Sequence, residues 1–137
     1  MINFVVCEDN KIILEKNVEI INKTMFNNNI NYRIYKFEDY TNDFKNIIYN
    51  SDIKIYILDI ELNKTSGIDI AREIRKKDLD SIIIISTAYV EYLPLALKNK
   101  LMLYDFISKF EDYEENLSKV INNALVQLKY YQEIKKK

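Results

Sequence analysis

The chain has 137 residues, the size of one ordinary domain, and with 48% apolar and 30% charged residues its composition is that of a folded globular protein. It contains no His and no Trp, and one each of Cys, Gly and Pro. Catalytic triads that need His, His-ligated metals and internal disulfides are therefore excluded. The net charge of −1 argues against nucleic-acid binding by this chain alone. Any chemistry must come from carboxylates, hydroxyls, lysines or a metal held by oxygen.

The cellular location is predicted from what the sequence lacks. No apolar run approaches the roughly 18 residues of a membrane helix. The first nine residues have no basic region followed by a long apolar one, so they do not form a signal peptide. Together with the single Cys, this predicts a cytoplasmic protein without membrane contact.

Short apolar runs alternate with longer amphipathic segments along the chain. In chain order they predict a strand at 2–7, a helix at 11–27 with Asn10 as its N-cap, a strand at 32–37, a helix at 41–49, a strand at 53–58, a helix at 68–76, a strand at 82–85, a weak helix at 90–98 containing Pro94, a strand at 104–107 and a helix at 111–134. The runs 53–58 and 82–85 are apolar throughout, as in strands buried on both faces. This alternation predicts an α/β fold, a parallel sheet with helices on both faces.

Polar side chains follow the predicted strands. They are Glu8 and Asp9 after the first, Asp59 with Glu61 after the third, Ser86 and Thr87 after the fourth, and Lys109 after the fifth. Because the carboxyl ends of parallel strands meet at one edge, we expect these groups to gather there. Converging carboxylates without fixed cationic partners would repel one another, and a divalent cation would relieve this. Oxygen ligands with room for water suit Mg²⁺.

A carboxylate held beside Mg²⁺ can attack phosphorus and form an aspartyl phosphate. The hydroxyl and the lysine would then neutralise the phosphoryl oxygens as charge develops on them. The set contains no general acid or base expected to titrate near neutral pH, in keeping with the absence of His.

At these residues the sequence resembles the receiver domain of bacterial two-component response regulators. The resemblance covers residues 1–128 and rests on the acidic pair Glu8-Asp9, segments 56–62, 86–88 and 106–109, and Gly67, eight residues after Asp59. It implies a flavodoxin-like (βα)5 doubly wound fold with five parallel strands in the order 2-1-3-4-5. Residues 129–137 would be a helical extension or the start of a linker to an output domain absent from this chain.

The resemblance also implies a role for each site residue. Asp59 would accept a phosphoryl group from the phosphohistidine of a sensor histidine kinase. Mg²⁺ would be bound by the side chains of Asp9 and Asp59, by Glu8 through water and by the backbone carbonyl of Glu61, while Thr87 and Lys109 would hold the phosphoryl oxygens. Phe106 takes the place of the aromatic switch residue, although a core role explains it equally. The domain would catalyse only its own phosphorylation and dephosphorylation.

More narrowly, the sequence looks like the receivers attached to LytTR-type DNA-binding domains of the accessory-gene-regulator kind. This likeness rests on segments 7–10, 67–75, 86–93 and 104–109. It implies transcription regulation, with DNA contacted only through the output domain. The surface formed by the fourth helix, the fifth strand and the last helix would change on phosphorylation and is a candidate homodimer contact. Residues 101–103 in that region would form an exposed apolar patch needing a partner.

Two departures from the family pattern keep alternatives open. Phe110 follows Lys109 where most receivers have Pro, and the loop between Asp59 and Gly67 also lacks the common Pro. One alternative, supported by Phe106 and by the missing Pro after Lys109, is a pseudo-receiver, a protein-interaction module that is never phosphorylated. Another is a small phosphatase of the aspartyl-phosphate type, but such enzymes usually need a second Asp where this chain has Glu61. Cys7 is expected to be a buried core residue rather than a redox centre.

Overall fold

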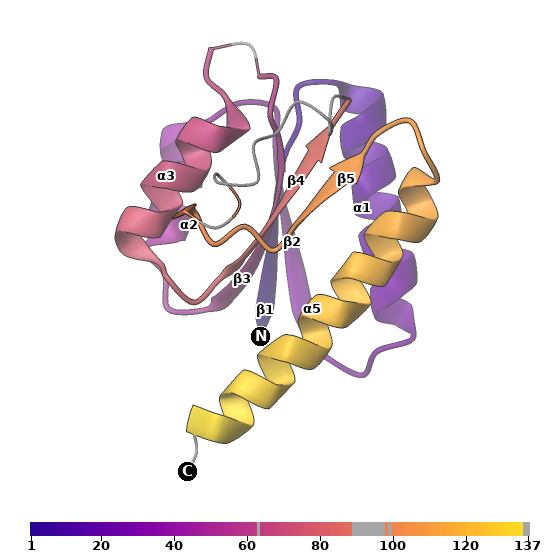
Figure 1. Ribbon diagram of the computed structural model, residues 1–137, viewed down its shortest axis with the longest axis vertical. Helices are drawn as coiled ribbons and strands as arrows, with labels where there is room; N and C mark the ends of the chain where they lie inside the picture. The colour runs from indigo at the N-terminus through magenta and orange to yellow at the C-terminus, as the bar shows by residue number, and fades with distance from the viewer. Residues whose placement is uncertain (63, 89–97, 99, 136–137) are drawn as a thin grey trace.

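Five apolar segments pair edge to edge as parallel strands of one sheet (Figure 1). The computed structural model describes residues 1–62, 64–88, 98 and 100–135, with side chains in the last helix as far as residue 129. The strands are β1 (Ile2–Cys7), β2 (Tyr32–Phe37), β3 (Ile53–Asp59), β4 (Ile82–Thr87) and β5 (Asp105–Ser108). Their order is β2-β1-β3-β4-β5 and every neighbouring pair is parallel. The predicted α/β fold and strand order are confirmed.

The helices lie on both faces of this sheet. They are α1 (Lys11–Phe26), α2 (Asn42–Ile48), α3 (Gly67–Lys77) and α5 (Tyr113–Lys135). Helices α1 and α5 cover one face, and α2 and α3 lie on the other (Figure 1). The predicted N-cap is confirmed, because the Asn10 side chain accepts hydrogen bonds from the N–H groups of Ile12 and Ile13. The predicted helix at 90–98, with Pro94, falls almost wholly outside the described residues.

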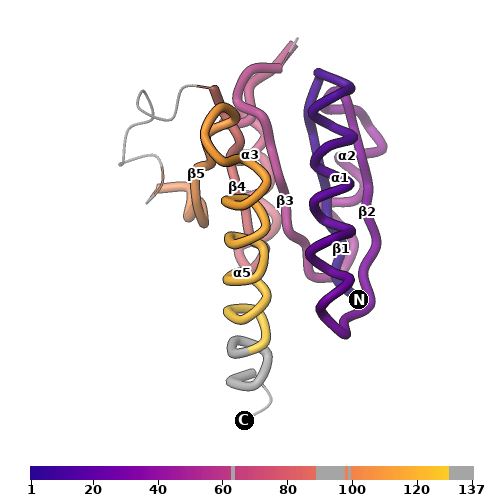
Figure 2. Tube along the Cα trace, turned by 90° about the vertical axis from the view of Figure 1, so that its right-hand side faces the viewer, coloured from indigo at the N-terminus to yellow at the C-terminus, as the bar shows by residue number. Residues whose placement is uncertain are grey.

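Helix α5 runs lengthwise beside the sheet (Figure 2) and continues past its lower edge (Figure 1). Its 23 residues span roughly 35 Å, whereas the longest strand, with seven residues, spans roughly 23 Å. Among the described residues, none of the helices has the length and apolar character needed to cross a membrane.

The sheet separates two apolar cores. Along β3, Ile55 and Ile57 face the core beneath α1 and α5, whereas Tyr56 and Leu58 face the core beneath α2 and α3. We call these the α1/α5 core and the α2/α3 core. Every residue of β4, and every residue of β3 after Ile53, is buried, as their apolar runs predicted, and β1 is buried throughout as well. Cys7 lies fully buried in the α2/α3 core, which confirms its structural role.

Several elements end at residues other than those predicted. Strand β3 includes Asp59 and β4 includes Ser86 and Thr87, although the apolar runs stop earlier, because Asp59 pairs with Ser86 in the parallel ladder. Helix α5 begins at Tyr113 rather than at residue 111, and the preceding Asp112 has a φ of 47°, in the left-handed region. Backbone pairing and turn geometry, rather than hydropathy, determine these ends.

The expected exposed patch at residues 101–103 is wrong. Leu101 and Leu103 are each only 5% exposed and belong to the α2/α3 core, and only Met102 is exposed. Arg75 on α3 holds this segment from outside, since its guanidinium donates hydrogen bonds of 2.8 Å to the carbonyls of both Leu101 and Met102. A long-range contact of this kind leaves no signal in the local hydropathy pattern.

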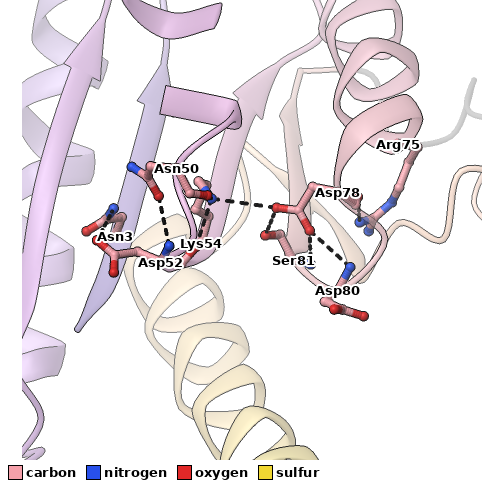
Figure 3. Close-up of polar contacts among 8 residues, drawn as sticks. All are labelled: Asn3, Asn50, Asp52, Lys54, Arg75, Asp78, Asp80 and Ser81. Carbon is pink, nitrogen blue, oxygen red and sulfur yellow. Dashed lines mark hydrogen bonds and ion pairs between the residues drawn. The ribbon is translucent and has the colours of Figure 1, made fainter. Parts of the chain in front are cut away.

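A buried lysine ties two loops together at the amino edge of the sheet (Figure 3). Lys54, on β3, is 1% exposed, and its ammonium donates hydrogen bonds of 2.7 Å to the carbonyls of Asn50 and Asp52. The ammonium also lies 3.8 Å from a carboxylate oxygen of Asp78, which in turn accepts a hydrogen bond from Ser81. The loop before β3 is thereby joined to the loop before β4.

We predict that Lys54→Met lowers the free energy of unfolding by about 3 kcal/mol, because it leaves two carbonyls and the Asp78 carboxylate without their cation. Urea denaturation measures this loss. The exposed Lys77→Met on α3 is the matched control and should change stability by less than about 0.5 kcal/mol. Equal stabilities of the two variants would show that Lys54 does not tie the loops together.

Candidate functional site

The strand register brings the predicted site residues to one edge of the sheet. Cys7 pairs with Leu58, so the residues that follow them, Glu8 and Asp59, stand side by side. Asp59 in turn pairs with Ser86 on β4. By the alternation along each strand, these side chains point to the face that α1 and α5 cover. The expectation that the polar strand ends gather at the carboxyl edge is confirmed.

Three carboxylates form a cluster there. One oxygen from each of Glu8, Asp9 and Asp59 lies within 4.8 Å of the others. Glu8 and Asp59 are 1% and 4% exposed, and Asp9 is half-buried. A set of carboxylate oxygens beside a partly open position has the donor chemistry that Mg²⁺ takes in proteins.

Glu61, the remaining predicted metal residue, has an exposed side chain outside this cluster. Its N–H donates a 3.2 Å hydrogen bond to the Asp59 carboxylate, and the residue forms a backbone bridge with Ser66. This bridge closes the loop after Asp59 and holds the Glu61 backbone near the carboxylates. The metal-binding role of its carbonyl stays a prediction.

Lys109 reaches into the cluster from the loop after β5. Its ammonium lies 2.5 Å from an oxygen of Glu8 and 3.1 Å from an oxygen of Asp59. The backbone N–H of Lys109 donates a 2.9 Å hydrogen bond to the backbone carbonyl of Thr87, the buried last residue of β4. The expectation that the carboxylates lack a fixed cationic partner is therefore wrong, because the Lys109 ammonium contacts both Glu8 and Asp59.

This burial shifts the protonation equilibria of the site. The net pKa of Glu8 is raised to about 7, because burial and the neighbouring Asp59, which raise it, outweigh Lys109, which lowers it. Burial alone lowers the pKa of Lys109, but Glu8 and Asp59 outweigh this, so the net shift is upward and the ammonium stays charged. The expectation that no group titrates near neutral pH is wrong, because the sequence does not show how deeply Glu8 is buried.

Gly67 permits the loop after Asp59 to fold back on its own strand. A Cβ at this position would lie 2.3 Å from the Asp59 carbonyl oxygen, far inside van der Waals contact. The Gly67 N–H donates a 3.0 Å hydrogen bond to the carbonyl of Ile60. Close approach, rather than a positive φ, therefore requires glycine here.

Phe106 on β5 is half-buried and packs against the α2/α3 core. The ammonium of Lys98 lies 5.9 Å from the centre of its ring. This placement agrees with a core role, and the switch role stays a prediction.

Three polar residues near the site were not singled out together from the sequence. Asn17, Ser86 and Tyr113 come from α1, β4 and α5, are all buried, and form hydrogen bonds with one another. The sequence pattern does mark two of them, Asn17 and Tyr113, by their spacing from apolar residues. Asn17 stands on the apolar stripe of α1 between Leu14 and Ile21, and Tyr113 lies four residues before the buried Leu117.

Comparison with known proteins agrees with this fold. The family model of the response regulator receiver domain matches residues 4–122. No curated protein matches the chain. A response regulator receiver domain protein from Clostridium thermocellum is 23% identical, with a TM-score of 0.78, and the match covers 96% of this chain and 99% of the other.

Two further solved structures are similar. The response regulator TrrA of Thermotoga maritima, solved in complex with Mg²⁺-BeF, is 28% identical over 89% of this chain and 98% of its own, with a TM-score of 0.69. The response regulatory domain of mrkE from Klebsiella pneumoniae is 19% identical over 93% and 98%, with a TM-score of 0.76. At 19% and 23% identity, the likeness to the mrkE domain and the Clostridium protein shows the fold alone.

We predict that two substitutions move the pKa of Glu8 in opposite directions. Asp59→Asn removes a neighbouring negative charge and should lower the pKa of Glu8, whereas Lys109→Met removes the cation and should raise it. Carboxyl ¹³C NMR titration without divalent cations measures both shifts. The control Glu115→Gln, exposed on α5, should leave the Glu8 titration unchanged. Shifts of the same sign would contradict the arrangement of charges described above.

Proposed function

The chain belongs to the family of response regulator receiver domains, and we propose that it is a phosphorylation-controlled switch in which Asp59 is the phosphoacceptor. The observation that carries this proposal is the contact of one ammonium, that of Lys109, with both Glu8 and Asp59 at the carboxyl edge of the sheet. A nucleophilic carboxylate beside a lysine and two further carboxylates is suited to phosphoryl transfer and lacks the groups that other covalent mechanisms need.

The donor would be the phosphohistidine of a sensor histidine kinase, since this chain has no His. A carboxylate oxygen of Asp59 forms the new P–O bond while the P–N bond to the donor imidazole breaks, and the imidazole takes the electron pair of that bond. Lys109 neutralises charge on the phosphoryl oxygens, and the Thr87 hydroxyl donates to one of them. The domain catalyses only its own phosphorylation and dephosphorylation and turns over no other substrate.

Mg²⁺ is the cofactor that this donor set fits. Oxygen ligands within reach of one another come from Glu8, Asp9 and Asp59. The backbone carbonyl of Glu61 would be the fourth ligand from the protein. When bound, the ion supplies positive charge that offsets the phosphoryl oxygens. The Mg²⁺-BeF complex of TrrA, at 28% identity, supports this assignment.

We also propose how the switch produces its output. Phosphorylation would change the face that the helix predicted at 90–98 would form with β5 and α5. Two copies could pair through this face, and Phe106 would take part as the aromatic switch. Residues 1–128 would be the receiver, and residues 129–137 would lead to a LytTR-type DNA-binding domain that regulates transcription in the cytoplasm. The continuous course of α5 to Lys135 supports a helical connection.

Labelling with acetyl phosphate and Mg²⁺ tests the phosphoacceptor. We expect intact-protein mass spectrometry to show one added phosphoryl group on the wild-type chain, and none when EDTA is present or in Asp59→Asn. The control Asp69→Asn, at an exposed position on α3, should be labelled like the wild type.

Three outcomes would count against the proposal. Labelling of Asp59→Asn at the wild-type rate would exclude Asp59 as the acceptor. A folded wild-type chain that takes up no phosphoryl group would favour the pseudo-receiver, a protein-interaction module. Multiple turnover of a phosphate ester would favour a phosphatase.

A further inference from the structure

A buried chain of hydrogen bonds joins three elements beneath the acidic cluster. Ser86, on β4, donates a 3.1 Å hydrogen bond to the hydroxyl oxygen of Tyr113, at the start of α5. That hydroxyl donates in turn to the side-chain carbonyl of Asn17, on α1. The three residues are 2%, 7% and 1% exposed, so water cannot readily replace a lost bond.

This hydrogen-bonded chain is adjacent to the phosphoacceptor. Ser86 is the ladder partner of Asp59 and directly precedes Thr87. The net pKa of Tyr113 is raised to about 12, because burial and the charges of Glu8 and Asp59 outweigh the hydrogen bonds with Ser86 and Asn17, which lower it. The hydroxyl therefore stays protonated and remains a donor at neutral pH.

Tyr113 also ends the loop that carries Lys109. The start of this loop is held by the hydrogen bond from the Lys109 N–H to the Thr87 carbonyl. The residues between, 110–112, are all exposed, with Phe110 at 78% and Asp112 at a φ of 47°. Only three exposed residues separate Lys109 from the first inward-facing side chain after it, that of Tyr113.

Other polar contacts also join α1 to α5 at their outer side, beginning with the exposed ion pair of Lys23 with Glu114 at 3.3 Å. Thr24 bonds Ser118 at 2.9 Å, and Asn28 bonds Asn122 at 3.1 Å. These bonds align the two helices but do not reach β4. Among the described residues, several hydrogen bonds join α1 to α5. Only those of Tyr113 also reach β4, the strand beside Asp59.

We propose that Tyr113 is a positioning residue for phosphoryl transfer, and this rests on the function proposed above. Its hydroxyl, held between Ser86 and Asn17, fixes the far end of the 110–112 loop and thereby keeps the Lys109 ammonium over Glu8 and Asp59. A phenylalanine would fill the same space but would leave Ser86 and Asn17 without their partner. The hydroxyl, rather than the ring, is therefore the part that positions Lys109.

The test compares Tyr113→Phe with Thr24→Val. Both replacements remove one hydroxyl and keep the side-chain volume, and both lie in the α1–α5 contact, but only Tyr113 leads to the loop. Amide hydrogen exchange of the Lys109 N–H, followed by NMR without phosphodonor, reports the anchoring. Acetyl phosphate labelling of Asp59 reports the consequence for the reaction.

We expect Tyr113→Phe to speed exchange of the Lys109 amide by about tenfold and to slow labelling several-fold, whereas Thr24→Val changes neither. Ser86→Ala, which keeps the tyrosine ring and removes its donor, should reproduce both effects of Tyr113→Phe in weaker form.

The proposal is overturned if Tyr113→Phe and Thr24→Val exchange the Lys109 amide at the same rate, or if exchange rises while labelling does not slow. A wild-type chain that is not labelled overturns the proposed function and with it the effect on transfer. The exchange rates then still decide whether Tyr113 anchors Lys109.

Discussion

Two buried carboxylates share one ammonium at the carboxyl edge of this sheet, and the rest of the structure is arranged around that constraint. Glu8 and Asp59 are removed from water and stand beside each other, which is unfavourable for two negative charges. Lys109 offsets part of this repulsion by direct contact with both. The raised pKa of Glu8 shows that the compensation is incomplete. A site in this condition favours any additional positive charge, which is the physical reason to expect Mg²⁺ there.

The fold keeps this unfavourable cluster in place with strong backbone and core contacts. Strands β1 and β3 are central and buried on both faces, so the ladder that aligns Glu8 with Asp59 cannot slip without exposing both apolar cores. The loop after Asp59 is closed on the same strand through Gly67.

Lys54 and Lys109, at opposite edges of the sheet, have different kinds of partner. Lys54 is bonded mainly to backbone carbonyls, which cannot change their charge or leave. Lys109 is held through side-chain carboxylates, which under the proposed function would release it when a phosphoryl group arrives. This difference separates a structural lysine from one that can take part in a switch.

Much of this arrangement is predictable from the sequence, because alternating apolar runs define the strands, and a parallel sheet then places Glu8, Asp9, Asp59 and Lys109 at one edge. The predictions fail where long-range tertiary contacts determine the burial and the partners of a side chain. Neither the ion pair from Lys109 to Glu8, nor the burial that raises the pKa of Glu8, follows from residue spacing. Leu101 and Leu103 are buried in a segment that Arg75, from a distant helix, holds by hydrogen bonds.

The most direct test of the central claim is a crystal structure of the chain with Mg²⁺ and beryllofluoride, a phosphoryl mimic. The account predicts beryllium bonded to a carboxylate oxygen of Asp59, fluorine atoms contacted by the Lys109 ammonium and the Thr87 hydroxyl, and the contact from Lys109 to Glu8 lengthened from 2.5 Å. An unmodified Asp59 at saturating beryllofluoride, with Lys109 still paired to Glu8, would contradict it.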